Sequence, residues 1–328
     1  MRVVVTGATS RLGRGVAEAL AARGDSVVVM QRRESGLVGA EFDVTEVRAD
    51  VGDPSDREAV RLAVSGAGAV VHLAAKVGIV GSAAEFARVN IGGTQAVLTA
   101  ARDAGVARFV QVSSPSVAHS GHSLVGVGAE PADPSAARGH YSRTKASAEI
   151  AALASHCDAM SVVAIRPHLV WGPGDTQLVG RIIERARSGR LALVGNGSAL
   201  IDTTYVDNAV DALVAAVDRA PLLGGQALVV SNGEPRSVAE LVARICAAAG
   251  VPGPKRNVPT SMAKFAGGVV ETAWALTRRT SEPPLTRFLA EQLSTAHWFD
   301  QRHTREALAW SPRISLDEGF DLLAASYR

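Results

Sequence analysis

The stretch MRVVVTGATSRLGRGVAEAL, residues 1–20, has the pattern of a strand, a glycine-containing turn and a helix. Arg2–Thr6 is rich in β-branched residues, which is typical of a strand that helices cover on both faces. Leu12–Arg23 carries apolar residues at helical spacing and stops at a glycine. Between them, Gly7 and Gly13 would let the chain turn tightly and approach a pyrophosphate at the start of the helix, although such glycines also occur for steric reasons alone. The chain therefore opens on a predicted dinucleotide-binding turn.

Strands and helices go on alternating to about residue 166. The further strands that we predict lie at Val27–Met30, Thr45–Ala49, Ala69–Leu73, Arg108–Val112 and Ser161–Arg166, and a long helix is predicted over 83–104. Strands joined by one helical crossover at a time form a parallel sheet with helices on both faces. We therefore predict an α/β fold with a doubly wound parallel sheet of the Rossmann type, an NADP-binding core over residues 1–166. Residues 167–328 are predicted to be mainly a smaller C-terminal substrate lobe, from which 205–250 partly return to the core.

Composition limits the class of protein. The chain has 328 residues, of which 47% are hydrophobic and 20% charged, so it can bury a substantial core. A formal net charge of +2 without blocks of like charge gives no support to nucleic-acid binding. Cys157 and Cys246 lack metal-type spacing and the histidines form no metal motif, so we expect no metal. The absence of an export signal and of a run of about 18 apolar residues predicts a cytoplasmic protein without a transmembrane segment.

The end of the second predicted strand bears on the choice of cofactor. It reads Met30-Gln31-Arg32-Arg33, with no carboxylate to hold a ribose 2′-hydroxyl and with two guanidinium groups that suit a 2′-phosphate. NADP(H) is therefore the predicted cofactor, and an ordinary solvated basic loop is the alternative. Asp50 could accept a hydrogen bond from the adenine or be a plain surface acid. The predicted cofactor-binding residues are Gly7, Thr9, Ser10, Arg11, Leu12, Gly13, Arg32, Arg33, Asp50, Val51, Ala74, Ala75, Asn90, Pro167, Tyr141 and Lys145.

Tyr141 and Lys145 form a Y-x-x-x-K pair, and four residues apart on a helix their side chains project from one face. A free phenol has a pKa of about 10. A neighbouring ammonium, together with the positive nicotinamide of an oxidised cofactor, would lower that pKa, so that Tyr141 could exchange a proton with a carbonyl oxygen. Ser114 follows the fifth predicted strand, where its hydroxyl could hold the same oxygen. The predicted catalytic residues are therefore Ser114, Tyr141 and Lys145.

Substrate contacts are less specific in the sequence. Ser116, His168 and Trp171 are candidates because they lie near the carboxyl ends of predicted strands, Trp171 as a lid residue. The segments Met262–Leu276 and Leu285–Trp298 are apolar with scattered polar positions. They could line a groove for alkyl chains or a sterol, or simply pack as two amphipathic helices on the core.

The motifs VTGATSRLG, RADVGD, HLAA, VNIGGT, VSSPSV, YSRTK and RPHLVWGPGD together resemble the extended short-chain dehydrogenase/reductase superfamily over essentially the whole chain. Within it, RPHLVWGPGD, VSNGEP and EPPLTRFLAEQLSTAHWFD resemble the branch of 3β-hydroxysteroid and sterol dehydrogenases, and more closely the bacterial 2-alkyl-3-oxoalkanoate reductases of long-chain olefin biosynthesis. The resemblance implies a catalytic triad of Ser114, Tyr141 and Lys145, with Asn90 supporting the cofactor. One departure is Ser10, which replaces the usual middle glycine and could donate its hydroxyl to a phosphate, with Arg11 adding to 2′-phosphate recognition.

The same resemblance implies a lipid-like small-molecule substrate, the 3-oxo group of a long-chain 2-alkyl-3-oxoalkanoate being reduced by NADPH to the 3-hydroxy acid. It also implies assembly with other enzymes of the olefin pathway and leaves room for a homo-oligomer. A 3β-hydroxysteroid or sterol dehydrogenase is the nearest alternative. A non-catalytic NADP-binding sensor is the second, and the intact Tyr141 and Lys145 argue against it.

Overall fold

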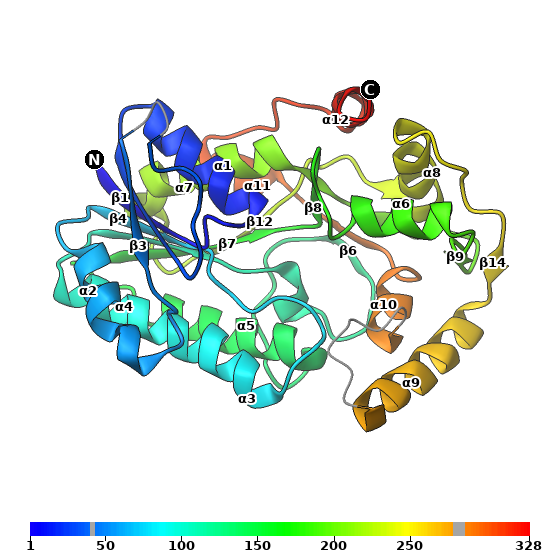
Figure 1. The fold of residues 1–328 in the computed structure, drawn as a ribbon, viewed down its shortest axis with the longest axis horizontal. Coiled ribbons are helices and arrows are strands. Elements are labelled where there is room, and N and C mark those ends of the chain that lie inside the picture. The colour runs from blue at the N-terminus through cyan, green and yellow to red at the C-terminus, as the bar shows by residue number, and fades with distance from the viewer. Residues whose placement is uncertain (40–42, 278–285) are drawn as a thin grey trace.

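A parallel sheet of seven strands forms the centre of the computed structural model, which describes residues 1–39, 43–277 and 286–328 (Figure 1). Its strands lie in the order β12-β7-β5-β4-β1-β2-β3. Their bounds are β1 Arg2–Thr6, β2 Ser26–Gln31, β3 Val44–Arg48, β4 Ala69–His72, β5 Arg108–Val112, β7 Ser161–Pro167 and β12 Ala227–Val230. The order runs outward from β1 in both directions, as in a Rossmann sheet, so the predicted doubly wound fold is confirmed.

Helices cover both faces of this sheet, which explains why its strands read as continuous apolar runs (Figure 1). Successive side chains of a strand point to opposite faces, so Val3 and Val5 pack on one side and Val4 on the other. The first face is covered by α1 Arg11–Ala22, α7 Val206–Leu223 and α11 Arg302–Leu308. The second is covered by α2 Arg57–Val64, which follows the short turn η1 Pro54–Asp56, by α4 Gly93–Asp103 and by α5 Gly139–Leu153.

The helix predicted over 83–104 is interrupted. It begins as α3 Ala83–Phe86, widens into a π-helical turn over Ala87–Gly92 and continues as α4. Such a turn holds one extra residue and is frequent at functional sites. Asn90 is the buried residue of this turn, and its side chain is directed to the loop that follows β4.

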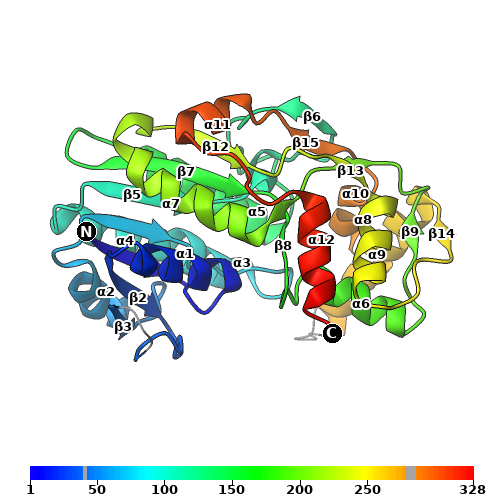
Figure 2. The same cartoon turned by 90° about the horizontal axis from the view of Figure 1, so that it is seen from above.

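The C-terminal lobe carries a second, smaller sheet (Figure 2). Its order is β13-β10-β15-β6, with β6 Leu124–Val127, β10 Leu200–Ile201, β13 Arg236–Ser237 and β15 His297–Phe299. Two short pairs accompany it, β8 Val170–Trp171 with β11 Thr204–Tyr205 and β9 Leu193–Val194 with β14 Asn257–Val258. The helices of the lobe are α6 Val179–Arg187, α8 Val238–Ala248, α9 Thr260–Thr277, α10 Arg287–Gln292 and α12 Leu316–Ala325. The loop after β5 contains the short turn η3 Pro115–Ala118 and then β6, so this loop reaches across to the second sheet.

The two apolar segments of the lobe differ in structure. Met262–Leu276 lies in α9, as a helical reading predicts, although the side chain of Leu276 is outside the described residues. The segment from Leu285 is not a second long helix: α10 ends at Gln292, Trp298 lies in β15, and Leu285 itself is outside the described residues. The helix ends where Ser294 and Thr295 turn their hydroxyls back onto the carbonyl oxygens of the preceding turn. No helix in the described parts of the chain is both long and apolar enough to cross a membrane.

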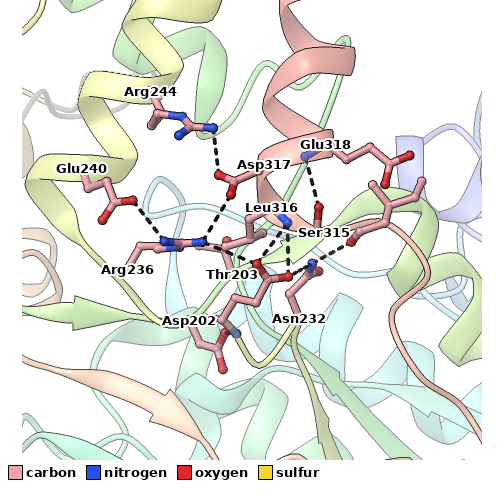
Figure 3. A network of polar contacts seen from close by, with 12 residues as sticks. Asp202, Thr203, Asn232, Arg236, Glu240, Arg244, Ser315, Leu316, Asp317 and Glu318 are labelled. Carbon is pink, nitrogen blue, oxygen red and sulfur yellow. Dashed lines mark hydrogen bonds and ion pairs between the residues drawn. The ribbon is translucent and has the colours of Figure 1, made fainter.

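A polar network holds α12 against α8 (Figure 3). Arg236 lies 3.7 Å from Asp317, and Arg244 lies 2.8 Å from the same carboxylate. The side-chain amide of Asn232 donates to the carbonyl oxygen of Ile314 at 2.9 Å, just before the helix begins. These contacts seat α12 over the core of the C-terminal lobe.

Candidate active site and cofactor site

The turn between β1 and α1 allows close approach to its backbone. Gly7 has a φ of +77°, and a Cβ there would lie 3.0 Å from the amide nitrogen of Ala74. A Cβ at Gly13 would lie 2.5 Å from the carbonyl oxygen of Gly7, so glycine is required at both positions. Residues 9–11 are exposed at the N-terminus of α1, where unpaired amides favour an anion. The residues present therefore fit a pyrophosphate.

Ser10 takes the place of the middle glycine without strain. Its φ of −77° and ψ of 151° are open to any residue, so no glycine is needed there. Its hydroxyl accepts from the amide of Gly13 at 3.0 Å and donates to the carbonyl oxygen of Gly7 at 2.8 Å. The expectation that this hydroxyl donates to a phosphate therefore needs correction, because Ser10 uses it to cap α1. Since the first amides of a helix have no intrahelical acceptor, we infer that Arg11 and Leu12 are the phosphate donors here.

The end of β2 has the basic character that its sequence indicates. Gln31 is only 4% exposed, and its side-chain amide donates to Glu46 on β3 at 3.2 Å. Arg32 and Arg33 follow it and are exposed. The structure thus leaves two guanidinium groups, and no carboxylate from β2, beside the position that a ribose 2′-substituent takes in this fold.

Asp50 and Val51 follow β3, and both side chains already contact other protein groups. The carboxylate of Asp50 accepts from the amide of Gly52 at 2.9 Å and lies 4.0 Å from Arg32. A contact to adenine would have to share a carboxylate that already serves this turn. Val51 is buried and packs against Gly93, so its side chain belongs to the core and is not free to touch a cofactor.

Asn90 organises the loop after β4, which begins with Ala74 and Ala75. Its Oδ1 accepts from the amide of Lys76 at 2.7 Å, and its Nδ2 donates to the carbonyl oxygen of Lys76 at 3.1 Å and to Thr144 at 2.9 Å. Because these protein atoms take up its side-chain amide, Asn90 can support a cofactor only indirectly, through the loop and α5.

A chain of hydroxyl groups leads to Tyr141. Ser116 donates to the Oγ of Ser114 at 3.0 Å, and the hydroxyl of Ser114 lies near enough to the phenol of Tyr141 to act on its pKa. Burial raises the pKa of Tyr141 to about 12, and the hydroxyl of Ser114 works in the opposite direction. The sequence predicted these two residues as partners, and the structure brings them together. The expected lowering of the Tyr141 pKa by Lys145 is not found, because desolvation raises this pKa; the lowering expected from an oxidised nicotinamide stays a prediction.

Lys145 is held on the same side of α5. Its Nζ donates to the carbonyl oxygen of Val112 at 2.6 Å, and burial lowers its pKa to about 8, while the charge of Glu149 raises it. Glu149 is itself paired with the buried Arg166 of β7 at 2.5 Å. This pair fixes α5 against the sheet one turn beyond Lys145.

Sequence reasoning missed His72, which lies buried at the end of β4. Its Nδ1 is 2.8 Å from the Oγ1 of Thr6 and its Nε2 is 3.2 Å from the Oγ1 of Thr94. Thr94 donates in turn to the carbonyl oxygen of Asn90 at 2.7 Å. Burial, followed by the charge of Lys145, lowers the pKa of His72 to about 3, so it is a neutral link between β1 and the π-helical turn. The motifs VTG, HLAA and VNIGGT contain these residues, but only the fold brings them together.

The candidate substrate residues after β7 lie deeper than expected. Pro167 ends β7, and His168 next to it is buried, with its Nε2 2.9 Å from the Nδ1 of His297. Trp171 is only 2% exposed and stacks on Phe320 at 4.6 Å between ring centroids. The expectation that Trp171 is a lid is therefore corrected, because its indole is part of the core of the lobe.

A cavity of about 860 Å³ lies beside Tyr141, between the Rossmann core and the C-terminal lobe. The core contributes residues 78–81 and 135–143, and the lobe contributes Trp274 of α9 together with Arg287, Phe288 and Leu289 of α10. The wall thus combines aromatic and aliphatic side chains with Glu271 and four arginines, Arg138, Arg143, Arg181 and Arg287. This volume falls within the range of about 300–1,000 Å³ that is usual for small-molecule sites.

Residues 3–230 match the NAD dependent epimerase/dehydratase family. The chain is 41% identical over 334 aligned positions to a protein of Stenotrophomonas maltophilia (strain K279a) named 2-alkyl-3-oxoalkanoate reductase, with 99% of both chains covered. It is 29% identical over 341 positions to the Homo sapiens sterol-4-alpha-carboxylate 3-dehydrogenase, decarboxylating, covering 100% of this chain and 88% of that one.

A solved structure, MoeE5 in complex with UDP-glucuronic acid and NAD, superposes with a TM-score of 0.74 at 25% identity, covering 99% of this chain and 98% of the other. The likeness extends through both the sheet and the C-terminal lobe.

Proposed function

The chain belongs to the NAD dependent epimerase/dehydratase family, and we propose that it uses NADPH to reduce the 3-oxo group of a long-chain 2-alkyl-3-oxoalkanoate. Membership makes it an NAD(P)-dependent oxidoreductase of the extended short-chain dehydrogenase/reductase type, as its motifs predict. The observation that carries the proposal is the half-buried pair of Ser114 and Tyr141 beside a cavity whose wall joins apolar and aromatic side chains to several arginines. The 41% identical relative carries the name of this activity.

In this proposal NADPH, when bound over the turn between β1 and α1, supplies the hydride. Tyr141 gives its proton to the ketone oxygen as that oxygen gains electrons. Ser116 donates to Ser114, whose hydroxyl would hold the same ketone oxygen as Tyr141. Lys145, anchored on β5, keeps a positive charge beneath the site and supports the return of a proton to Tyr141.

The raised pKa of Tyr141 suits its role as the acid in the reduction that we propose. With that pKa raised to about 12 by burial, the phenol stays protonated at neutral pH and can act as an acid. Alcohol oxidation would require the phenolate as a base, and the positive charge of an oxidised nicotinamide would favour that form.

We propose NADP(H), and not NAD(H), as the cofactor. Arg32 and Arg33 stand exposed after β2 where an NAD enzyme usually places a carboxylate. A guanidinium can bind a phosphate through two charge-assisted hydrogen bonds. A role in olefin biosynthesis, assembly with other enzymes of that pathway, a homo-oligomer and a cytoplasmic location remain predictions from the sequence.

The test is NADPH oxidation measured with a long 2-alkyl-3-oxo acid and, in parallel, with a 3-oxosteroid. We expect turnover of the acid and none of the steroid. Steroid turnover alone would establish the rival activity, a 3β-hydroxysteroid or sterol dehydrogenase, which the 29% identical Homo sapiens relative favours. Tight NADPH binding without turnover of either substrate would support the non-catalytic sensor.

A further inference from the structure

A second cavity, of about 90 Å³, lies inside the C-terminal lobe. Its wall is built mainly from aliphatic side chains, with Ile182 from α6, Val242 and Ile245 from α8, and Leu289 and Leu293 from α10. One water needs about 10–15 Å³ on this measure, so the space exceeds a packing defect. Empty apolar cavities weaken a fold, and they bind apolar groups readily.

Two polar side chains of this wall, those of Thr203 and His297, are hydrogen-bonded to other protein groups. The Oγ1 of Thr203 accepts from the indole of Trp171 at 3.0 Å. His297 is bonded at Nδ1 to His168 and at Nε2 to the carbonyl oxygen of Gln292, both at 2.9 Å. Burial lowers the pKa of His297, which keeps the ring neutral. The cavity therefore suits a hydrocarbon and gives little attraction to a charged head group.

Leu289 connects this cavity to the reaction centre. It lines the 90 Å³ cavity and also the 860 Å³ cavity that contains Tyr141. It lies on α10, which is only six residues long and stands between the two spaces. Leu289 is thus a wall that the two cavities share.

We propose that the cavity beneath α10 takes the terminal methylenes of one of the two alkyl chains of the substrate and so sets the chain length that the enzyme prefers. This inference rests on the proposed function. The cavity is well below the roughly 300 Å³ at which whole-ligand pockets begin, so it fits the end of a linear chain and not a fused ring system. The other alkyl chain remains in the larger cavity.

The decisive variant is Val242→Phe, which places a ring in the cavity from α8 without touching Ser114, Tyr141 or Lys145. Two series of 2-alkyl-3-oxo acids are compared, each with one chain short and the other lengthened stepwise. In the wild type, each methylene that enters the cavity should raise kcat/KM by about fourfold. In Val242→Phe this increment should vanish in one series, at the longer lengths only, while the shorter acids react as before.

Ala243→Phe is the matched control, because it adds the same ring at an exposed position of the same helix. Thermal unfolding verifies that both variants are folded, and Val242→Ala, which enlarges the cavity, should move the preferred length upward. Equal losses at all lengths, or unchanged length dependence in folded Val242→Phe and Val242→Ala, would overturn the inference.

A binding measurement separates this inference from the proposed function. Equilibrium dialysis with dodecanoic acid should show weaker binding to Val242→Phe than to the wild type, whichever carbonyl substrate is reduced. If no 2-alkyl-3-oxo acid is reduced but this difference persists, the reaction is wrong and the chain site stands. If the acids are reduced but dodecanoic acid binds equally to both proteins, the chain site is wrong.

Discussion

Lys145 donates a hydrogen bond from its Nζ to the carbonyl oxygen of Val112, 2.6 Å away at the end of β5. The next residues along the chain lead directly to Ser114, so this contact ties the helix that carries Tyr141 to the strand that presents the serine. It also holds an ammonium group in a buried position, with Glu149 as a nearby countercharge. The position of Lys145 has a measurable consequence for stability.

Stability should rise with pH because of Lys145. Its pKa is lowered from 10.5 to about 8, so between these values the unfolded chain binds a proton that the folded chain has released. From pH 8 to about 9.5 this should add up to about 2 kcal/mol to the free energy of unfolding, relative to Lys145→Met. Tyr141, whose pKa is raised, acts oppositely but only above about pH 10. The measurement is urea unfolding of the wild type and Lys145→Met across this pH range. If the free energy of unfolding changed with pH equally in both proteins, the lowered pKa of Lys145 would be contradicted.

Tyr141→Phe should abolish most turnover while leaving NADPH binding intact. The variant removes the proton donor, and such a loss lowers rates roughly 100- to 10,000-fold. Single-turnover kinetics would measure the chemical step, and fluorescence titration would measure NADPH affinity. Tyr327→Phe is the control, since Tyr327 is exposed at the C-terminus. Undiminished reduction by Tyr141→Phe would remove Tyr141 from the mechanism.

Substitutions at Ser10 should affect the helix more than the cofactor. Ser10→Ala removes the cap on Gly13 and should cost about 1 kcal/mol of unfolding free energy, whereas Ser10→Gly should cost only a few tenths. NADPH affinity should change little in either variant, because the hydroxyl is committed to Gly7. Thermal unfolding and NADPH titration test both statements. A large loss of affinity in Ser10→Ala alone would show that the hydroxyl does reach a phosphate.

Features that depend on nearby sequence could be predicted, and features that depend on residues far along the chain could not. The strands of the central sheet could be predicted because β-branched runs such as Arg2–Thr6 carry their own signal. The place of Ser114 in the site could be predicted because it follows β5 and parallel strands bring their carboxyl ends to one edge, whereas Tyr141 was found from its spacing to Lys145. The burial of Trp171 could not, since its ring packs on Phe320, which lies far along the chain. The raised pKa of Tyr141 could not be predicted for the same reason, because desolvation depends on every element packed around the site.

Arg32 should distinguish the two nicotinamide cofactors. Its side chain is 65% exposed and lies 4.0 Å from Asp50, so it is available to a phosphate. Arg32→Gln should weaken NADPH binding roughly 10- to 100-fold, the usual value of hydrogen bonds to a charged group, and leave NADH binding nearly unchanged. Arg61→Gln serves as the control, because Arg61 is similarly exposed at 62% and pairs only locally with Glu58. Equal weakening of NADPH and NADH by Arg32→Gln would refute the assignment of Arg32 to the 2′-phosphate.

The attachment of α12 should depend on packing more than on charge. Phe320 is buried against Trp171, so Phe320→Ala should cost about 3–5 kcal/mol of unfolding free energy. Asp317, by contrast, is more than half exposed where it pairs with Arg244, so Asp317→Asn should cost at most about 1 kcal/mol. Chemical denaturation of the two variants compares these values directly.

Because the indole of Trp171 is also a wall of the 90 Å³ cavity, Phe320→Ala should weaken dodecanoic acid binding as well, and Asp317→Asn should not. A cost for Asp317→Asn as large as that for Phe320→Ala would mean that the network in Figure 3, and not the aromatic stack, holds the helix in place.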